Sequence, residues 1–245
     1  MTAPHERRLS SHPVAVVTGT GNPRGIGAAT VRRLTAAGAH VLAAVAPGEE
    51  PPAEATAALA IDLSAAEAAD EILRAAADRL GEPASILVAS AAHSTRDGFE
   101  TLDAATLDAH YAVNLRATAL LAAGLCRALP EDRAGRIVAL TSGQTLGPMP
   151  GELAYGASKG ALEALVRTLA AEVGHLGVTV NAVNPGPTDT GWMDDATRAE
   201  LLTRFPSGRL GEADDAARLI AFLASDDARW ITGQVIASEG GFLRS

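Results

Sequence analysis

A short apolar run that leads into a glycine-rich turn and then an amphipathic segment constrains this chain more than any other feature. Residues 14–17 read Val-Ala-Val-Val, and residues 18–27 read Thr-Gly-Thr-Gly-Asn-Pro-Arg-Gly-Ile-Gly. Apolar residues then recur with helical spacing over residues 26–37, so the order strand, turn, helix is predicted. Glycines let backbone approach a pyrophosphate closely, and a helix N-terminus offers unpaired N–H groups. The turn predicts a dinucleotide site; a tight connection without a ligand is the alternative.

The same alternation continues along the chain. Further strands are expected at residues 40–45, 58–61, 85–91, 136–141, 178–183 and 234–237, and helices at 65–80, 102–129, 153–175 and 214–224. Short apolar strands separated by helices predict a parallel sheet covered on both faces. We therefore expect a single-domain Rossmann-type doubly wound α/β fold over residues 13–245, after a flexible N-terminus at 1–12. Asp62 and Ser64 are the expected caps of the helix at 65–80.

Composition excludes several classes of protein. The net charge of -9 and pI near 5.1 do not provide the basic surface that nonspecific nucleic-acid binding needs. The one cysteine, Cys126, cannot form an internal disulfide, and no Cys/His cluster has zinc spacing, so no metal is expected. Residues 1–13 lack the apolar run of a signal peptide, and no stretch approaches the roughly 18 apolar residues of a membrane span. We expect a cytoplasmic protein with no membrane partner.

The residues after the second strand bear on which dinucleotide binds. An acid about 20 residues beyond the glycine-rich turn binds the ribose of NAD in many such folds. Here residues 46–48 read Ala-Pro-Gly, with no carboxylate before Glu49, and Arg24 in the turn could neutralise a 2′-phosphate. This pattern favours NADP(H) over NAD(H). A solvated loop arginine is the alternative interpretation of Arg24.

A tyrosine and a lysine carry the clearest chemical signal. Tyr155 precedes Lys159, the only lysine in the chain, by four residues on a predicted helix, which places both on one face. A nearby cation stabilises phenolate and lowers the pKa of a tyrosine, which makes it a usable acid or base for interconverting carbonyl and alcohol. Ser142, after the preceding strand, could bind the same carbonyl oxygen, and Asn114 could hold a water that passes protons to Lys159. An exposed surface pair is the alternative.

Together these residues resemble the short-chain dehydrogenase/reductase family over residues 13–242, most closely its 3-oxoacyl-[acyl-carrier-protein] reductase-like members. The resemblance implies Asn114, Ser142, Tyr155 and Lys159 as the catalytic set. It implies a cofactor site formed by Gly19, Gly21, Arg24, Gly25, Ile26, Gly27, Asp62, Leu63, Ser90, Ala91, Tyr155, Lys159, Pro185, Gly186, Thr188 and Thr190. It also implies a homotetramer or homodimer, with the helices at 102–129 and 153–175 as the interface.

Two departures from the family pattern stand out. The glycine-rich turn has two extra residues around Asn22 and Pro23, which changes where Arg24 falls. After the fourth strand the family reads Asn-Asn-Ala-Gly, whereas residues 89–92 here read Ala-Ser-Ala-Ala. The lost amides are expected to weaken hydrogen bonds to the sheet or the cofactor without removing a group that handles protons.

The substrate side of the expected site is less defined. Gln144 and Met149, between Ser142 and Tyr155, together with Trp192 and Met193 are expected to line the pocket, and residues 187–207 to form a lid over it. An ordinary surface helix is the alternative for that segment. The arginines at 127, 133 and 136 form the densest basic group, either a contact for an acidic acyl carrier protein or simply solvated side chains.

The function predicted from the sequence is hydride transfer between NADP(H) and a ketone or secondary alcohol, with a 3-oxoacyl thioester as one candidate substrate. Two alternatives remain at this point. One is an NAD-dependent alcohol dehydrogenase that runs toward oxidation. The other is a nucleotide-sensing regulator that binds the cofactor but has lost catalysis, for which the altered residues 89–92 are the support.

Overall fold

A seven-stranded parallel sheet forms the centre of the protein. The computed structural model describes residues 6–242. The strands are β1 (Val14–Thr18), β2 (His40–Val45), β3 (Ala57–Ala60), β4 (Ile86–Ala89), β5 (Gly135–Leu140), β6 (Val178–Asn184) and β7 (Val235–Ala237). Their order in the sheet is β3-β2-β1-β4-β5-β6-β7. The first three strands are added toward one edge of the sheet, and β4 to β7 are added toward the other edge. The two halves meet between the parallel neighbours β1 and β4. This is the doubly wound fold expected from the alternating pattern.

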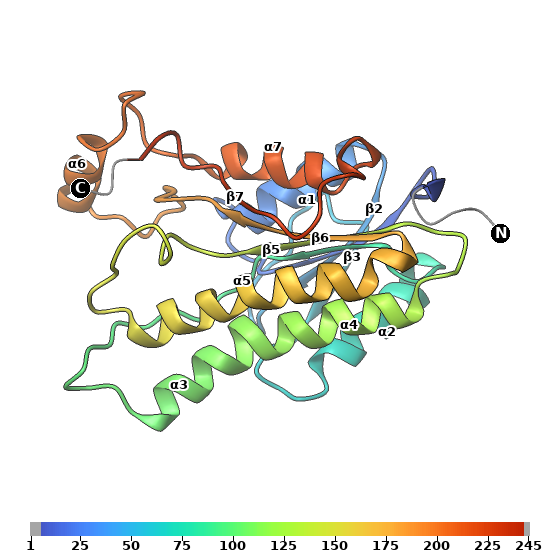
Figure 1. Ribbon diagram of the computed structural model, residues 1–245, viewed down its shortest axis with the longest axis horizontal. Coiled ribbons are helices and arrows are strands. Elements are labelled where there is room, and N and C mark those ends of the chain that lie inside the picture. Colours follow the sequence, from blue (N-terminus) through green and yellow to red (C-terminus); the bar gives the residue numbers. More distant parts are fainter. Residues whose placement is uncertain (1–5, 243–245) are drawn as a thin grey trace.

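Helices cover both faces of the sheet (Figure 1). They are α1 (Ile26–Ala36), α2 (Ala68–Leu80), α3 (Ala104–His110), a π-helical turn η2 (Tyr111–Ala117), α4 (Thr118–Ala128), α5 (Leu153–Val173), α6 (Asp195–Leu202) and α7 (Ala213–Leu223), with short 3₁₀ turns η3 (Gly174–Leu176) and η4 (Asp226–Ala228). Helices α1 and α7 lie on one face, and α2, α4 and α5 lie on the other.

The core explains why the strands form where they do. Every residue of β1, β4, β5 and β6 is buried, as expected for strands covered on both faces. Successive side chains point to opposite faces, so Val14 and Val16 belong to the cluster under α2, α4 and α5, whereas Ala15 and Val17 belong to the one under α1 and α7. The two clusters are built from Ala, Val, Leu and Ile, which fits a chain with 3% aromatic residues.

Two local features differ from the expectations. Helix α2 begins at Ala68 rather than at residue 65, and neither Asp62 nor Ser64 caps it. Asp62 instead accepts a hydrogen bond from the backbone amide of Ser64, 2.8 Å away, so the two residues form a turn before the helix. The long helix expected at residues 102–129 is three elements in series, with the π-helical turn between α3 and α4.

The N-terminal segment is attached to the domain where the structure describes it. Arg8 forms a β-bridge with Arg133, Arg7 donates to the carbonyl of Leu176 (2.6 Å), and the amide of Leu9 lies 3.3 Å from an oxygen of Asp226. Residues 1–5 of the expected flexible terminus lie outside the described residues. Within residues 6–242, no helix is both long enough and apolar enough to cross a membrane.

Candidate active site

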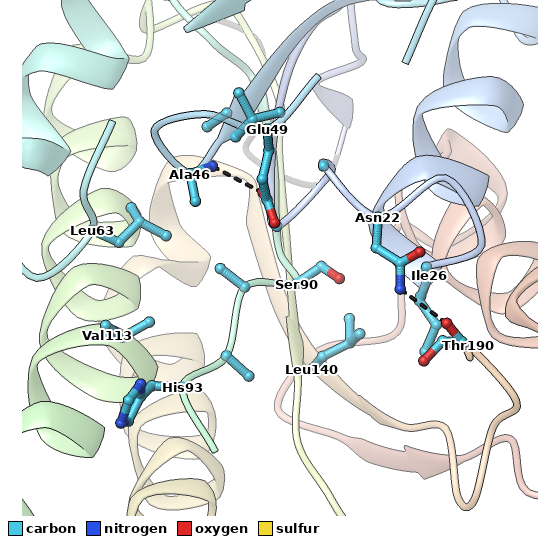
Figure 2. A pocket seen from close by; sticks show the side chains of 18 of the residues that line it. Asn22, Ile26, Ala46, Glu49, Leu63, Ser90, His93, Val113, Leu140 and Thr190 are labelled. Atoms are coloured by element: carbon cyan, nitrogen blue, oxygen red, sulfur yellow. Dashed lines mark hydrogen bonds between the residues drawn. The ribbon is translucent and has the colours of Figure 1, made fainter. Parts of the chain in front are cut away.

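A cavity of about 550 Å³ opens beyond the carboxyl ends of the strands, at the point between β1 and β4 where the two halves of the sheet meet. Ligands of doubly wound sheets bind at this switch point. The glycine-rich turn forms one wall, the loops after β2 and β3 form a second wall, and the start of α5 lies at the other end. Figure 2 shows Asn22 and Ile26 on one side of the cavity and Leu63, Val113 and His93 on the other.

The glycine-rich turn leaves no room for side chains. Gly19 has φ +69°, and a Cβ added there would lie 2.6 Å from Cα of Ala91. A Cβ at Gly27 would collide with the carbonyl oxygen of Gly19. Helix α1 starts after Gly25 with no acidic residue in its first turn, and its positive end lies at the cavity through Gly25, Ile26 and Gly27. The turn fits the pyrophosphate of a dinucleotide.

Thr18 joins the two strands at the switch point. Its hydroxyl oxygen accepts hydrogen bonds from the backbone amides of Ser90 (3.2 Å) and Ala91 (3.1 Å). These bonds tie the end of β1 to the loop after β4. Residues 89–92 lack the asparagine side chains of the family pattern, and the Thr18 hydroxyl binds the backbone amides of this segment.

Tyr155 and Lys159 enter the cavity from the first two turns of α5. The Lys159 ammonium lies 5.6 Å from the centre of the Tyr155 ring and donates a hydrogen bond of 2.7 Å to the carbonyl of Leu140, at the end of β5. The Ser142 side chain, two residues beyond Leu140, lies near Tyr155 and acts to lower the pKa of that phenol. The spacing predicted from the sequence thus brings phenol, ammonium and hydroxyl together.

The pKa values at this site differ from the sequence expectation. Burial raises the pKa of Tyr155 above its usual value, and the nearby Ser142 side chain opposes that rise only in part. Burial also lowers the pKa of Lys159 from 10.5 to about 8. The Tyr155 pKa is thus shifted in the direction opposite to the lowering expected from Lys159, because burial disfavours the charged phenolate. Tyr155 is therefore uncharged at neutral pH.

Asn114 lies in the π-helical turn and is fully buried. Its side chain accepts from the amide of His93 (2.7 Å) and donates to the carbonyl of His93 (2.9 Å) and to the hydroxyl of Ser158 (2.9 Å). All of these partners are protein groups. The side chain thus fastens the loop after β4 to α5, and the water-holding role expected for Asn114 stays a prediction.

The cavity wall after β2 holds one carboxylate that the sequence did not place there. Glu49 follows β2 in the loop, and its carboxylate folds back into the cavity wall to accept a hydrogen bond from the amide of Ala46 (3.1 Å), as Figure 2 shows. A carboxylate therefore does lie in the cavity wall just after β2. Arg24 is not among the residues lining the cavity. Its side chain, which is exposed, points to Asp189 instead (3.4 Å).

Most of the expected cofactor residues line the cavity, and a few do not. Those that line it are Gly19, Gly21, Gly25, Ile26, Gly27, Asp62, Leu63, Ser90, Ala91, Tyr155, Lys159, Pro185 and Thr190. Gly186 and Thr188 instead shape the turn after β6, where the Thr188 hydroxyl donates to the carbonyl of Pro185 (3.2 Å). Glu49, His93 and Val113 line it without having been predicted, because their approach depends on how distant loops fold together.

The sequence was compared with models of protein families and with other proteins. Residues 19–243 match the family model described as enoyl-(acyl carrier protein) reductase. The chain is 49% identical to an uncharacterised oxidoreductase of Bacillus subtilis over 96% of this chain and 98% of that protein. The chain belongs to the short-chain dehydrogenase/reductase family.

Two other reductases are similar to this chain, one in sequence and one in sequence and structure. The 3-oxoacyl-[acyl-carrier-protein] reductase of Pseudomonas aeruginosa is 36% identical over 95% of this chain and 98% of its own length. The solved structure of LugOII, described as a promiscuous reductase that catalyses keto-reduction at C1 during lugdunomycin biosynthesis, superposes with a TM-score of 0.84 at 34% identity. That match covers 96% of this chain and 98% of the other. Membership makes the chain an oxidoreductase that uses a nicotinamide cofactor.

None of the four residues expected to line the substrate pocket belongs to the cavity wall. Gln144 turns away, because its amide donates to Glu163 in α5 (2.7 Å). Met149 stays near, with its sulfur 3.9 Å from the Ser142 hydroxyl. Trp192 is 59% exposed, with its indole N–H bonded to the Thr188 carbonyl, whereas Met193 is buried.

The segment expected to form the lid, residues 187–207, contains the short helix α6. No residue within α6 is buried; Met193 before it and Phe205 after it anchor the segment. The Phe205 ring packs against Phe242 with centroids 5.1 Å apart. A surface helix is therefore present, and movement of the segment over the site stays a prediction.

The arginine group expected to contact a carrier protein is not a continuous basic surface. Arg136 is 1% exposed and donates to the carbonyls of Gly135 and Ser225 and to Asp226 (2.8 Å). Because this side chain is occupied inside the domain, it cannot meet an external partner. The part of the prediction that included Arg136 is wrong.

Proposed function

We propose that this chain interconverts a ketone and a secondary alcohol, with Tyr155 exchanging the proton. The observation that carries the proposal is that Tyr155 and Lys159 line the same cavity as the glycine-rich turn. A nicotinamide dinucleotide bound in this cavity would supply the hydride for reduction and accept it in the reverse direction. Hydride and proton together convert a carbonyl into an alcohol, so a proton donor at one end of a dinucleotide cleft is the chemistry required.

Each side chain has a role that follows from its position. Tyr155, neutral at physiological pH, donates its phenolic proton to the carbonyl oxygen during reduction. Ser142, which lies near Tyr155, holds the same oxygen in place. Lys159 provides a positive charge that stabilises the phenolate left after the proton is given up.

For the cofactor we propose NAD(H) as the preferred dinucleotide. The sequence expectation of NADP(H) relied on a missing carboxylate and on Arg24. The carboxylate of Glu49 lines the cavity beyond β2, and Arg24 pairs with Asp189. A carboxylate there accepts a ribose 2′-hydroxyl and repels a 2′-phosphate. Dissociation constants of the two cofactors, measured by fluorescence titration, test this; tighter binding of NADP(H) would contradict it.

The substrate class proposed is ketones and their secondary alcohols. Two reductases similar to this chain act on ketones by their names, one of them on 3-oxoacyl thioesters of acyl carrier protein. A 3-oxoacyl thioester is the finer candidate. It is tested by comparing kcat/KM for acetoacetyl-CoA, acetoacetyl-acyl carrier protein and simple hydrophobic ketones. A preference for the carrier-bound substrate would require a docking surface that does not use Arg136.

Tyr155→Phe tests the proposed function itself. Removing the hydroxyl takes away the proton donor but keeps the ring, so turnover should fall by about 10²- to 10⁴-fold while the cofactor dissociation constant changes little. Turnover near the wild-type rate would contradict the role of Tyr155. A wild-type protein that binds the cofactor but turns over no ketone or alcohol in a broad panel would favour the nucleotide-sensing regulator.

We also propose a homodimer or homotetramer that uses the outer surfaces of α3, η2, α4 and α5. Leu107, Tyr111, Leu120 and Leu153 expose between 41% and 53% of their surface along these elements. Such side chains gain from burial against a second copy. Sedimentation equilibrium tests this, and a monomer at micromolar concentration would contradict it.

A further inference from the structure

Tyr155 stands in the first turn of α5, so its position depends on how that turn is held. Helix α5 begins at Leu153, and Glu152 at its N-cap makes no side-chain capping bond within the described structure. The first amides of a helix have no partner inside the helix and need an acceptor from elsewhere. The acceptor that meets them therefore sets where the helix begins.

Asp97 supplies that acceptor from a distant part of the chain. Its Oδ2 accepts a hydrogen bond from the amide of Ala154, the residue just before Tyr155, at 2.9 Å. The amide of Asp97 donates to the carbonyl of Gly151, also at 2.9 Å. Asp97 is 6% exposed, so both bonds lie inside the protein. Asp97, in the loop after β4, thus forms hydrogen bonds to Gly151, just before α5, and to Ala154, in its first turn.

The loop that carries Asp97 is itself fastened to neighbouring helices. The backbone of His93 is bound on both sides by the Asn114 amide group, at 2.7 and 2.9 Å. The amide of Thr95 donates to Nε2 of the fully buried His110 at 3.2 Å. Because these hydrogen bonds hold the backbone of residues 93–97 in place, Asp97 has a fixed position from which to bind the start of α5.

The other carboxylate oxygen of Asp97 indicates that this arrangement has a cost. Oδ1 is buried and has no hydrogen-bond partner among residues 6–242. A buried acceptor without a partner costs about 1–3 kcal/mol. A serine or aspartate at residue 152 could cap α5 locally, at the surface, without that cost. A remote cap that leaves one oxygen unpaired calls for another explanation.

We propose that Asp97 is a positioning residue for the reaction: it holds the first turn of α5 so that the Tyr155 hydroxyl stays beside Ser142. This proposal rests on the proposed function of Tyr155. Asp97 itself touches neither the cavity nor the side chains of the reacting set. Its effect should therefore fall on the rate of the chemical step and on the environment of the phenol, and little on cofactor binding.

Three variants separate position from charge. Asp97→Ala removes the capping oxygen and the charge. Asp97→Asn removes the charge but keeps an oxygen that can accept from Ala154, and Asp97→Glu keeps the charge but moves the oxygens outward by one methylene. Arg96→Ala is the matched control, because Arg96 is the neighbouring residue, its side chain is 78% exposed, and it makes only a 3.8 Å ion pair with Glu152.

The environment of Tyr155 can be read directly, without turnover. The chain has two tyrosines, so in a Tyr111→Phe background the ultraviolet absorbance of tyrosinate reports Tyr155 alone. Burial holds the Tyr155 pKa above its usual value. A first turn that loosens exposes the phenol and lowers that pKa. We expect Asp97→Ala and Asp97→Glu to lower it and Asp97→Asn and Arg96→Ala to leave it in place.

Kinetics should follow the same order. Asp97→Ala and Asp97→Glu are expected to lower kcat by about 10- to 100-fold, the cost of a small displacement of a reacting group, with the cofactor dissociation constant within about twofold of wild type. Asp97→Asn and Arg96→Ala should keep most of kcat. If Asp97→Ala fails to fold, Asp97→Glu and Asp97→Asn decide the question.

Specific results would overturn the proposal. One is that kcat and the pKa of the Tyr155 phenol stay unchanged in Asp97→Glu and Asp97→Ala. The other is that Asp97→Asn lowers kcat and this pKa as much as Asp97→Ala does. Failure of the proposed function is distinguishable, since in that case wild type lacks turnover while the phenol titration still compares the variants.

Discussion

The Glu49 carboxylate and the Ala46 amide, 3.1 Å apart, form a small turn that places a negative charge at the end of β2. The same carboxylate lies against Gly21 of the glycine-rich turn, where any side chain would collide with it. The loop after β2 and the turn after β1 therefore meet through one acidic side chain and one glycine. This contact provides a test of cofactor choice.

Glu49→Gln is expected to shift the ratio of NADP(H) to NAD(H) affinity toward NADP(H) by on the order of tenfold. The change removes a charge that would repel a 2′-phosphate and keeps the length of the side chain. Titration of both cofactors measures the ratio. Glu50→Gln is the control, because Glu50 is exposed and does not line the cavity. An equal shift in both variants would mean that only the overall charge matters.

Lys159→Met should make the protein more stable and inactive. The amine is 2% exposed, and its burial lowers its pKa from 10.5 to about 8. Each pKa unit corresponds to about 1.4 kcal/mol, and the amine also bonds to Leu140, so we expect a gain of about 1–3 kcal/mol at neutral pH. Chemical denaturation measures the gain. Lys159→Arg, which adds a bulky planar group, should lose most activity without that gain.

The stability difference between wild type and Lys159→Met should depend on pH in a defined direction. The folded protein holds the Lys159 proton less tightly than the unfolded chain, so charging destabilises the folded state. The penalty is fully present below about pH 8 and disappears as the pH rises toward 10.5. Denaturation curves of both proteins at pH 7 and pH 10 test the sign, and a difference that grows with pH would contradict it.

Activity in the reducing direction should fall as the pH rises through about 8. Lys159 loses its proton in this range, and the charge that stabilises the Tyr155 phenolate goes with it. The pKa of Tyr155 is raised, so this tyrosine keeps its proton there and does not account for the loss. The pH profile of kcat/KM for the cofactor reports the ionisations of the free protein, to which this pKa belongs. A rate that stays constant to pH 10 would be inconsistent with this role of Lys159.

Glu163→Ala should destabilise the protein by about 2–4 kcal/mol. One oxygen of this buried carboxylate accepts from Gln144 (2.7 Å), Thr145 (3.2 Å) and Thr141 (3.4 Å). Truncation removes the acceptor of Thr145 and leaves Gln144 and Thr141 only their other bonds, to the Thr141 hydroxyl and to the Lys159 carbonyl. Glu172→Ala, at an exposed position of α5, is the control and should change the unfolding free energy by less than about 0.5 kcal/mol. Equal effects would show that the network carries little energy.

The fold was predictable from sequence because its signals are local. Apolar runs of four to seven residues, bounded by glycines or caps, placed all seven strands to within two residues at each end. The start of α2 was misplaced because Asp62 and Ser64 bond to each other, and both a cap and a turn use the same residue types.

The site was predictable where its residues are close in sequence. Tyr155 and Lys159 share a helix, so their spacing alone placed them together. Glu49 and Gln144 could not be placed in this way, because the direction of each side chain depends on a partner in space: the Ala46 amide for Glu49 and the Glu163 carboxylate for Gln144. Sequence proximity says nothing about which way a loop side chain turns.

The π-helical turn at Tyr111–Ala117 has a consequence for how this chain tolerates insertions and deletions. A π-helical turn contains one residue more than the α-helical turn it replaces, so it corresponds to a one-residue insertion within a helix. Deleting one residue within this turn would restore regular α-helix and leave α3 and α4 in their present relative orientation, with His110 still beside Thr95. Deleting one residue from the regular part of α4 would instead rotate the residues before it by about 100° relative to those after it. The middle of this long helical segment is therefore a place where the chain can lose one residue, as a surface loop can.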